Sequence, residues 1–154
     1  MLNEAVCFQL IGDLVTSLHL KMRNQLVTSI RPDLSHLDVS AASPIEKFQN
    51  QTLRPIIKLQ HEILVALVTA IPHFSTLLHN AKTEEDYKGK VIAFLKLQSP
   101  AKNQIIGMVA GLFTTDEWMN YAEHKSEYNK RIIHMTGERV SGFCWKANDK
   151  SSVD

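Results

Sequence analysis

Cysteine is nearly absent from the chain, which has two, Cys7 and Cys144, near opposite ends. Neither belongs to a CxxC pair or to a spaced cysteine–histidine set, so a disulfide or zinc framework is not expected. Long apolar runs are also missing, because Asp13 and Lys21 interrupt the most apolar stretch before it reaches the roughly 18 residues of a membrane span. The residues before that stretch include Glu4 and no Lys or Arg, which argues against a secretory signal. These absences predict a cytoplasmic protein that does not enter a membrane.

An excess of charge of one sign is missing too. The 154 residues hold 17 Lys+Arg and 16 Asp+Glu, which leaves a formal net charge of +1. A protein that binds nucleic acid mainly through phosphates normally carries a larger or more localised basic excess. The hydrophobic and charged fractions, 44% and 21%, are those of an ordinary globular chain, and the length suits one domain. Composition therefore argues against a nucleic-acid partner and names no other.

Helix start signals are the clearest local feature. The segments SPIE from Ser43 and TTDE from Thr114 have the sequence of a capping box. Thr83 before three acidic residues and Ser99 before a proline mark two further starts. No stretch alternates with period two, so strands are not expected. The predicted helices cover residues 16–30, 44–71, 84–97, 100–112 and 115–141, with a helical turn at 74–80 and a loop at 31–42. This pattern predicts an all-α fold, a single-domain helical bundle of about five helices.

The segment 44–71 is predicted to form a long central helix with a kink at Pro55. Pro55 has no backbone N–H, and its ring disturbs the carbonyl group of Gln51, so a helix that continues through it should bend. The apolar residues of this helix follow three- and four-residue steps or their sums, at Phe48, Leu53, Ile56, Leu59, Ile63, Leu67 and Ile71. The last predicted helix has the same pattern at Trp118, Tyr121, Tyr128, Ile132, Met135 and Val140. Both patterns predict buried faces.

Motifs that carry chemistry are lacking. The seven histidines do not follow a glutamate by three residues, as helical di-metal sites require, and HExxH is absent. No GxSxG, dinucleotide-binding or Walker motif is present. Gly107 and Gly111 form GxxxG, which in this context predicts close helix packing. We therefore expect no metal, no cofactor and no catalytic residue.

Helices 100–112 and 115–141 have a turn between them that would suit a helix-turn-helix. The second helix, however, begins Thr-Asp-Glu-Trp and would present carboxylates to DNA phosphates. DNA binding is a minor alternative.

Polar residues around Pro55 form the candidate site, together with three residues of the last helix that are expected to face them. They are Gln49, Asn50, Arg54, Gln60, Arg131, His134 and Glu138. Two interpretations stay open. Buried amides need hydrogen-bond partners, so these groups can serve the kink itself, with Arg54 paired to Glu138 or Glu127. Alternatively, they form a small polar patch that binds a ligand.

Three segments, FQNQTLRPIIKLQHEIL, IIGMVAGLFTTDEW and NKRIIHMTGERV, resemble a family of small bacterial proteins with an RPxxKxQ core segment and a GxxxGxFxxxE segment. The similarity covers about residues 22–141. Proteins that resemble these have sometimes carried the name glyoxalase, which implies a metal site on paired βαβββ modules; the sequence has neither the strands nor the ligand spacing. The resemblance implies a compact all-helical domain and transfers no activity or catalytic residue.

The resemblance begins at Met22, so we expect residues 1–21 to be an N-terminal extension, 22–145 a single helical domain and 146–154 a frayed tail. The leading prediction for function is a binding or self-association module without catalysis. A homodimer is expected, because this many apolar residues on few helices exceed what one small core can cover. The alternative is a small-molecule-binding enzyme or sensor with its polar pocket at the Pro55 kink.

Overall fold

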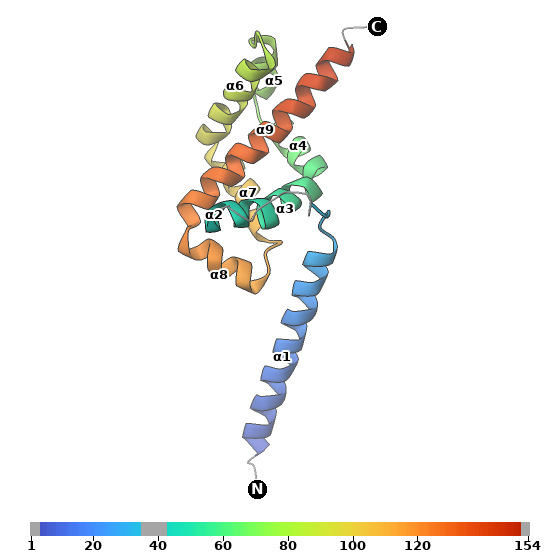
Figure 1. Cartoon of the computed structure of the whole chain (residues 1–154), viewed down its shortest axis with the longest axis vertical. Helices are drawn as coiled ribbons and strands as arrows, with labels where there is room; N and C mark the ends of the chain where they lie inside the picture. Colours follow the sequence, from blue (N-terminus) through green and yellow to red (C-terminus); the bar gives the residue numbers. More distant parts are fainter. Residues whose placement is uncertain (1–3, 35–42, 152–154) are drawn as a thin grey trace.

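The computed structural model of the protein describes residues 4–34 and 43–151, and every regular element within them is helical (Figure 1). In chain order these elements are α1 (Glu4–Ser29), α2 (Pro44–Phe48), the π-helical turn η1 (Gln49–Leu53), α3 (Arg54–Leu59), α4 (His61–Thr69), α5 (Phe74–His79), α6 (Glu84–Leu97), α7 (Ser99–Ala110), α8 (Thr115–Glu123) and α9 (Lys125–Ser151). The all-α prediction is confirmed. The predicted number of about five helices is too low, because two of the predicted long helices are divided.

Helix α9 is the axis of the helical body. Helix α6 packs along it, and α7, α4, α3 and η1 also contact it (Figure 1). The core between them is apolar and aromatic, with Phe48, Leu53, Ile56, Leu64, Val68, Tyr87, Val91, Leu95, Ile105, Val109, Phe113, Tyr121, Tyr128, Ile132 and Val140 all buried. Burial of these side chains is the main term that stabilises the body, since each contributes about 1.5–3 kcal/mol.

Three of the four predicted helix starts have the predicted caps, whereas Ser99 is the first residue of α7, whose N-cap is Gln98 with no side-chain cap bond. The hydroxyls of Ser43 and Thr114 accept the backbone N–H of Glu46 and Glu117, and both glutamates reach back to the cap N–H. The Thr83 hydroxyl accepts the backbone N–H of Asp86, the third residue of α6. The observed bounds of α6 are the predicted ones, 84–97. Helix α5 matches the predicted helical turn at 74–80 to within one residue.

The predicted single helix over 44–71 with a kink at Pro55 is not observed. A π-helical turn precedes the proline, and within it the Arg54 N–H bonds to the carbonyl oxygen of Gln49, five residues back. This shifted hydrogen-bond register accommodates a residue that has no N–H to donate. The break comes later, at Gln60, where φ is −86° and ψ is 10°. Because of this break, the residues of α4 no longer face the core in the order that one continuous helix predicts. Ile63 is 58% exposed, and Leu64 is buried instead.

The predicted helix 115–141 is also divided, at His124, which has φ −124° and ψ 29°. Helix α8 thus crosses the end of the body (Figure 1), and Trp118, predicted on a buried face, is 50% exposed. Helix α9 continues to Ser151, through residues for which a frayed tail was expected. Residues 152–154 of that tail and residues 35–42 of the predicted loop lie outside the described residues.

The glycines do not pack as the GxxxG spacing predicts. Gly107 is exposed, and a Cβ atom placed on it would meet nothing within 4 Å. Gly111 is exposed as well and stands at the end of α7, next to that helix's own carbonyl groups. Close packing occurs instead at Gly137 of α9, where a Cβ would lie 2.7 Å from Cγ1 of Ile92 on α6. The GxxxG prediction is therefore wrong, and Gly137 lets α6 and α9 approach.

Helix α1 projects away from the body and is tied to it at its C-terminal end (Figure 1). Arg23 donates to the carbonyl oxygens of Phe113 and Gly111 at 2.7 and 2.8 Å. Arg31, just after the helix, forms a two-pronged ion pair with Glu117, with its shortest N–O distance 2.6 Å. The helix continues without a break through Met22, the predicted start of the domain. None of the described helices combines the length and the apolar character that crossing a membrane requires.

Candidate functional site

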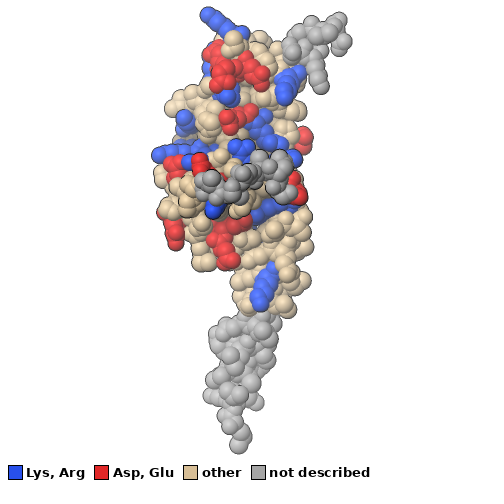
Figure 2. Space-filling view, viewed as in Figure 1, with Lys and Arg blue, Asp and Glu red and all other residues tan. Residues whose placement is uncertain are grey.

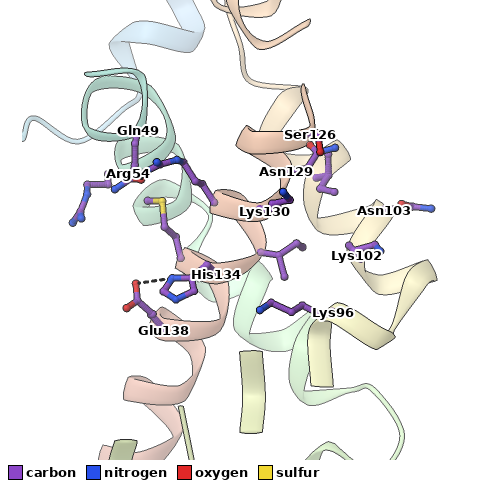
Figure 3. A pocket seen from close by; sticks show the side chains of 14 residues that line it. Gln49, Arg54, Lys96, Lys102, Asn103, Ser126, Asn129, Lys130, His134 and Glu138 are labelled. Carbon is purple, nitrogen blue, oxygen red and sulfur yellow. Dashed lines mark hydrogen bonds and ion pairs between the residues drawn. The ribbon is translucent and has the colours of Figure 1, made fainter. Parts of the chain in front are cut away.

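A cleft of about 920 Å³ lies along the outer side of α9. The turn η1 and helix α3 border it on one side of α9, and α7 with the end of α6 borders it on the other (Figure 3). Its lining residues are Gln49, Arg54, Lys96, Lys102, Asn103, Ile106, Ser126, Asn129, Lys130, Arg131, Ile133, His134, Met135 and Glu138. The residues that form it lie far apart in the sequence, and the packing of α9 between α3 and α7 brings them together.

The regular helix of α9 explains why so many polar groups share this cleft. Ser126, Lys130, His134 and Glu138 follow one another at intervals of four residues, so they lie in a row along one side of the helix. The other side of α9 carries Tyr128 and Ile132, which are buried against the body. The amphipathic pattern of α9 therefore orients its polar row outward, into the cleft.

The cleft is strongly cationic. Among the described residues that line it, five are Lys or Arg, whereas one, Glu138, is a carboxylate. Lys and Arg side chains gather across the middle of the molecule on the face shown in Figure 2. Four of the cations, Arg54, Lys96, Lys102 and Lys130, form no ion pair within residues 16–34 and 43–148. Their charges are therefore available to an anion.

Arg131 differs from these four because it is already held by protein groups. Its Nε donates to Glu127 at 3.1 Å, and one of its terminal nitrogens donates to the side-chain oxygen of Gln49. This bond joins η1 to α9 and fixes one wall of the cleft. Arg131 and Gln49 are both half-buried, which suits a structural contact at the edge of a site.

A smaller cleft of about 430 Å³ adjoins the first. Arg54, Met135 and Glu138 line both, and the second adds Lys58 and Arg139. Burial lowers the pKa of Arg139, whose Nε lies 3.2 Å from Nδ1 of His61. The cationic surface thus continues around α9 beyond the larger cleft.

Five of the seven residues predicted for the site line the larger cleft: Gln49, Arg54, Arg131, His134 and Glu138. Asn50 lies in η1 and Gln60 at the junction of α3 and α4, and neither lines it. The predicted ion pair of Arg54 with Glu138 or Glu127 is not formed. Glu127 binds Arg131, and Glu138 lies 3.6 Å from Nδ1 of His134 (Figure 3). Arg54 is exposed instead, as a ligand-binding arginine would be.

Sequence reasoning missed the lysines of the cleft and the polar residues beside them. These are Lys96, Lys102, Asn103, Ser126, Asn129 and Lys130. A four-residue series from Ser126 to Glu138 was the available signal for α9. No sequence signal places the end of α6 and the start of α7 opposite that row, because tertiary packing determines it.

The chemistry that these groups offer is binding of negative charge. His134 and Glu138 are the one histidine–carboxylate pair among the described residues of the cleft, and their side chains are 53% and 45% exposed. Among the residues that the structure describes, no group of three or more His, Cys, Asp or Glu side chains could hold a metal ion.

The comparisons with known proteins are silent on this site. No family model, no curated protein and no solved structure matches the chain.

Proposed function

We propose that the protein binds an anionic small molecule in the cleft along α9 and acts by binding rather than by catalysis. The observation that carries this proposal is the set of four cationic side chains, Arg54, Lys96, Lys102 and Lys130, that line one cleft and have no carboxylate partner within residues 16–34 and 43–148. Like charges that share a cleft repel one another, so an anion that binds among them relieves this repulsion as well as forming its own contacts.

The size and polarity of the cleft fit this ligand class. Its volume of about 920 Å³ lies within the range of pockets that hold small molecules. Asn103, Ser126 and Asn129 add neutral hydrogen-bond donors on the side of the cleft next to α7 (Figure 3). A phosphate or carboxylate group accepts bonds from both kinds of donor.

The arrangement of His134 and Glu138 in the cleft favours binding over catalysis. A general base works best where water is excluded and its orientation is fixed. His134 and Glu138 are about half exposed, and their 3.6 Å separation is longer than a hydrogen bond. The pair therefore serves the proposal better as part of the binding surface.

Titration calorimetry with inorganic pyrophosphate tests the proposal. We expect Lys130→Gln and Arg54→Gln each to weaken binding about two- to fivefold, the range for a partly solvated charge pair. Glu138→Gln should strengthen binding by a similar factor, and added salt should weaken it. Lys21→Gln on α1 removes the same charge away from the cleft and should change nothing. Undetectable binding, or equal effects of Lys21→Gln and Lys130→Gln, would contradict the proposal.

Self-association through α1 is the second candidate function. Leu18, Met22, Leu26 and Ile30 follow one another at four-residue intervals and are 52–63% exposed. The 26 residues of α1 include four charged ones, whereas a solvated surface is about 25–35% charged. The projecting helix cannot be covered by the body of its own chain, and a second copy offers the same apolar helix to pair with.

Sedimentation velocity separates a dimer from a monomer. Leu18→Glu with Leu26→Glu should shift a dimer to the monomer mass, because it places charges on the apolar side of α1. Leu97→Glu changes an exposed leucine at the end of α6, 80% exposed, and should leave the mass unchanged. A wild-type chain that is monomeric at high micromolar concentration would remove this candidate.

The cytoplasmic location stays a prediction from the sequence. The same holds for the boundaries at residues 21 and 145, and for the resemblance to the bacterial family.

A further inference from the structure

A groove of about 450 Å³, separate from the smaller cleft beside Arg139, adjoins the cationic cleft on the side of α8. It is lined by Asn103, Ile106, Gly107, Ala110, Gly111, Trp118, Tyr121, Lys125 and Asn129. Three of these residues, Asn103, Ile106 and Asn129, line the cationic cleft as well. The groove and the cleft therefore adjoin at these three residues.

The residues that line the groove suit the binding of an aromatic ring. One wall is α7, where Gly107 and Gly111 present backbone and no side chain, and a Cβ on Gly107 would meet nothing within 4 Å. Trp118 lines the groove too; its indole is half exposed, and its ring centroid lies 5.3 Å from that of Tyr121. An exposed indole beside a smooth helix surface offers an aromatic ring apolar contact and ring–ring contact at once.

Asn129 connects the groove to the cleft. Its side-chain oxygen accepts the Tyr121 hydroxyl at 2.6 Å, which orients the amide and leaves its NH₂ group as a donor. A donor at this junction suits the oxygen that joins an anionic group to a ring. Among the described residues, the groove adds Lys125 and no carboxylate, so these residues do not repel the negative end of such a ligand.

We infer that the ligand is an aromatic organic anion, such as an aryl phosphate or a nucleotide, with its anionic group among the cations of the cleft and its ring in the groove beside Trp118. This inference rests on the proposed anion-binding function and specifies the ligand further. The charge of the cleft determines where the anionic end binds, and the shared residues determine where the rest of the molecule lies.

Titration calorimetry with two probes of equal charge tests the inference. Methyl phosphate carries the anionic group without a ring, and 1-naphthyl phosphate carries both. We expect 1-naphthyl phosphate to bind at least about tenfold more tightly, since removing about 60 Å² of apolar surface from water corresponds to that factor. Equal affinities for the two probes would overturn the inference and leave the proposed function intact. Binding of neither probe to a protein that binds pyrophosphate would overturn the inference alone, whereas absence of binding for all three compounds would overturn both.

A variant whose side chain fills the groove tests whether the aromatic ring binds there. Gly107→Leu should remove the advantage of 1-naphthyl phosphate and leave methyl phosphate binding unchanged. Gly89→Leu is the matched variant, because Gly89 is also an exposed helical glycine at which an added Cβ would meet nothing within 4 Å; it should keep the full advantage. Trp118→Ser should lower 1-naphthyl phosphate affinity alone. If Gly107→Leu and Trp118→Ser both retain the wild-type ratio, the ring does not lie in this groove and the inference is wrong.

Discussion

Replacement of Arg31 with methionine should lower the free energy of unfolding by about 2–4 kcal/mol. Arg31 donates to both carboxylate oxygens of Glu117, at 2.6 and 2.7 Å, and to the carbonyl oxygen of Leu112 at 2.6 Å. The two side chains are 7% and 19% exposed. Loss of one partner of a buried ion pair costs about 3–5 kcal/mol. The Nε of Arg31 is buried without a hydrogen-bond partner, which lowers the stabilisation that Arg31 provides, so we expect a smaller loss.

The effect should depend on pH through Glu117. Burial alone would raise the pKa of this carboxyl group, but the Arg31 guanidinium, the Thr114 N–H and the Thr52 hydroxyl together hold the pKa below its ordinary value of 4.5. The unfolded chain therefore takes up the proton first as the pH falls. The stabilisation by Glu117 is complete above about pH 4.5 and is lost as the pH falls through the lower pKa of the folded state.

Urea denaturation followed by circular dichroism at pH 7 and at pH 3 measures both effects. Lys21→Met, which removes an exposed cation of α1, is the control and should stay within about 0.5 kcal/mol of wild type. The difference between Arg31→Met and wild type should shrink at pH 3, below the ordinary carboxyl pKa of 4.5, because the unfolded chain then binds a proton that the ion-paired Glu117 of the folded chain resists. An Arg31→Met effect no larger than that of Lys21→Met, or one that is constant with pH, would refute this account of how the Arg31–Glu117 ion pair stabilises the protein.

Two further variants test the packing of α9, each by denaturation. Gly137→Ala should destabilise the protein by about 1–3 kcal/mol, because the added Cβ would lie 2.7 Å from Ile92, whereas Gly142→Ala meets nothing and should stabilise α9 by about 0.5–1 kcal/mol. Equal effects of the two would contradict the close approach of α6 and α9. Burial, and then the neighbouring Cys144, raise the pKa of Tyr87, so stability should fall as the pH rises above about 10, where the unfolded tyrosine ionises. Tyr87→Phe should make that fall less steep, and an unchanged slope would contradict the burial of the hydroxyl.

Local signals predicted the parts of the fold that depend on local chemistry. The cap residues Ser43, Thr83 and Thr114 mark helix starts because side-chain oxygens satisfy the first N–H groups of a helix wherever it packs. The breaks at Gln60 and His124 carry no glycine or proline, so no local signal predicts them. Tertiary packing of α4 and α8 against the body selects those breaks.

The candidate site shows the same division. Polar residues around Pro55 and on the last helix were predicted to lie together, and Gln49, Arg54 and His134 do line one cleft. The cationic character of the cleft was missed, because a net charge of +1 averages over the whole chain. Lys96 and Lys102 come from another part of the sequence, and the fold, not their spacing, brings them to α9.

The central claim, an anion site along α9, is tested most directly by the amide spectrum of the ¹⁵N-labelled protein during titration with pyrophosphate. We expect the largest shifts to belong to residues 126–138 of α9 and to those around Arg54 and Lys102, and to saturate together. Shifts that are absent, or that appear equally around the exposed lysines Lys21 on α1 and Lys82 before α6, would contradict the claim.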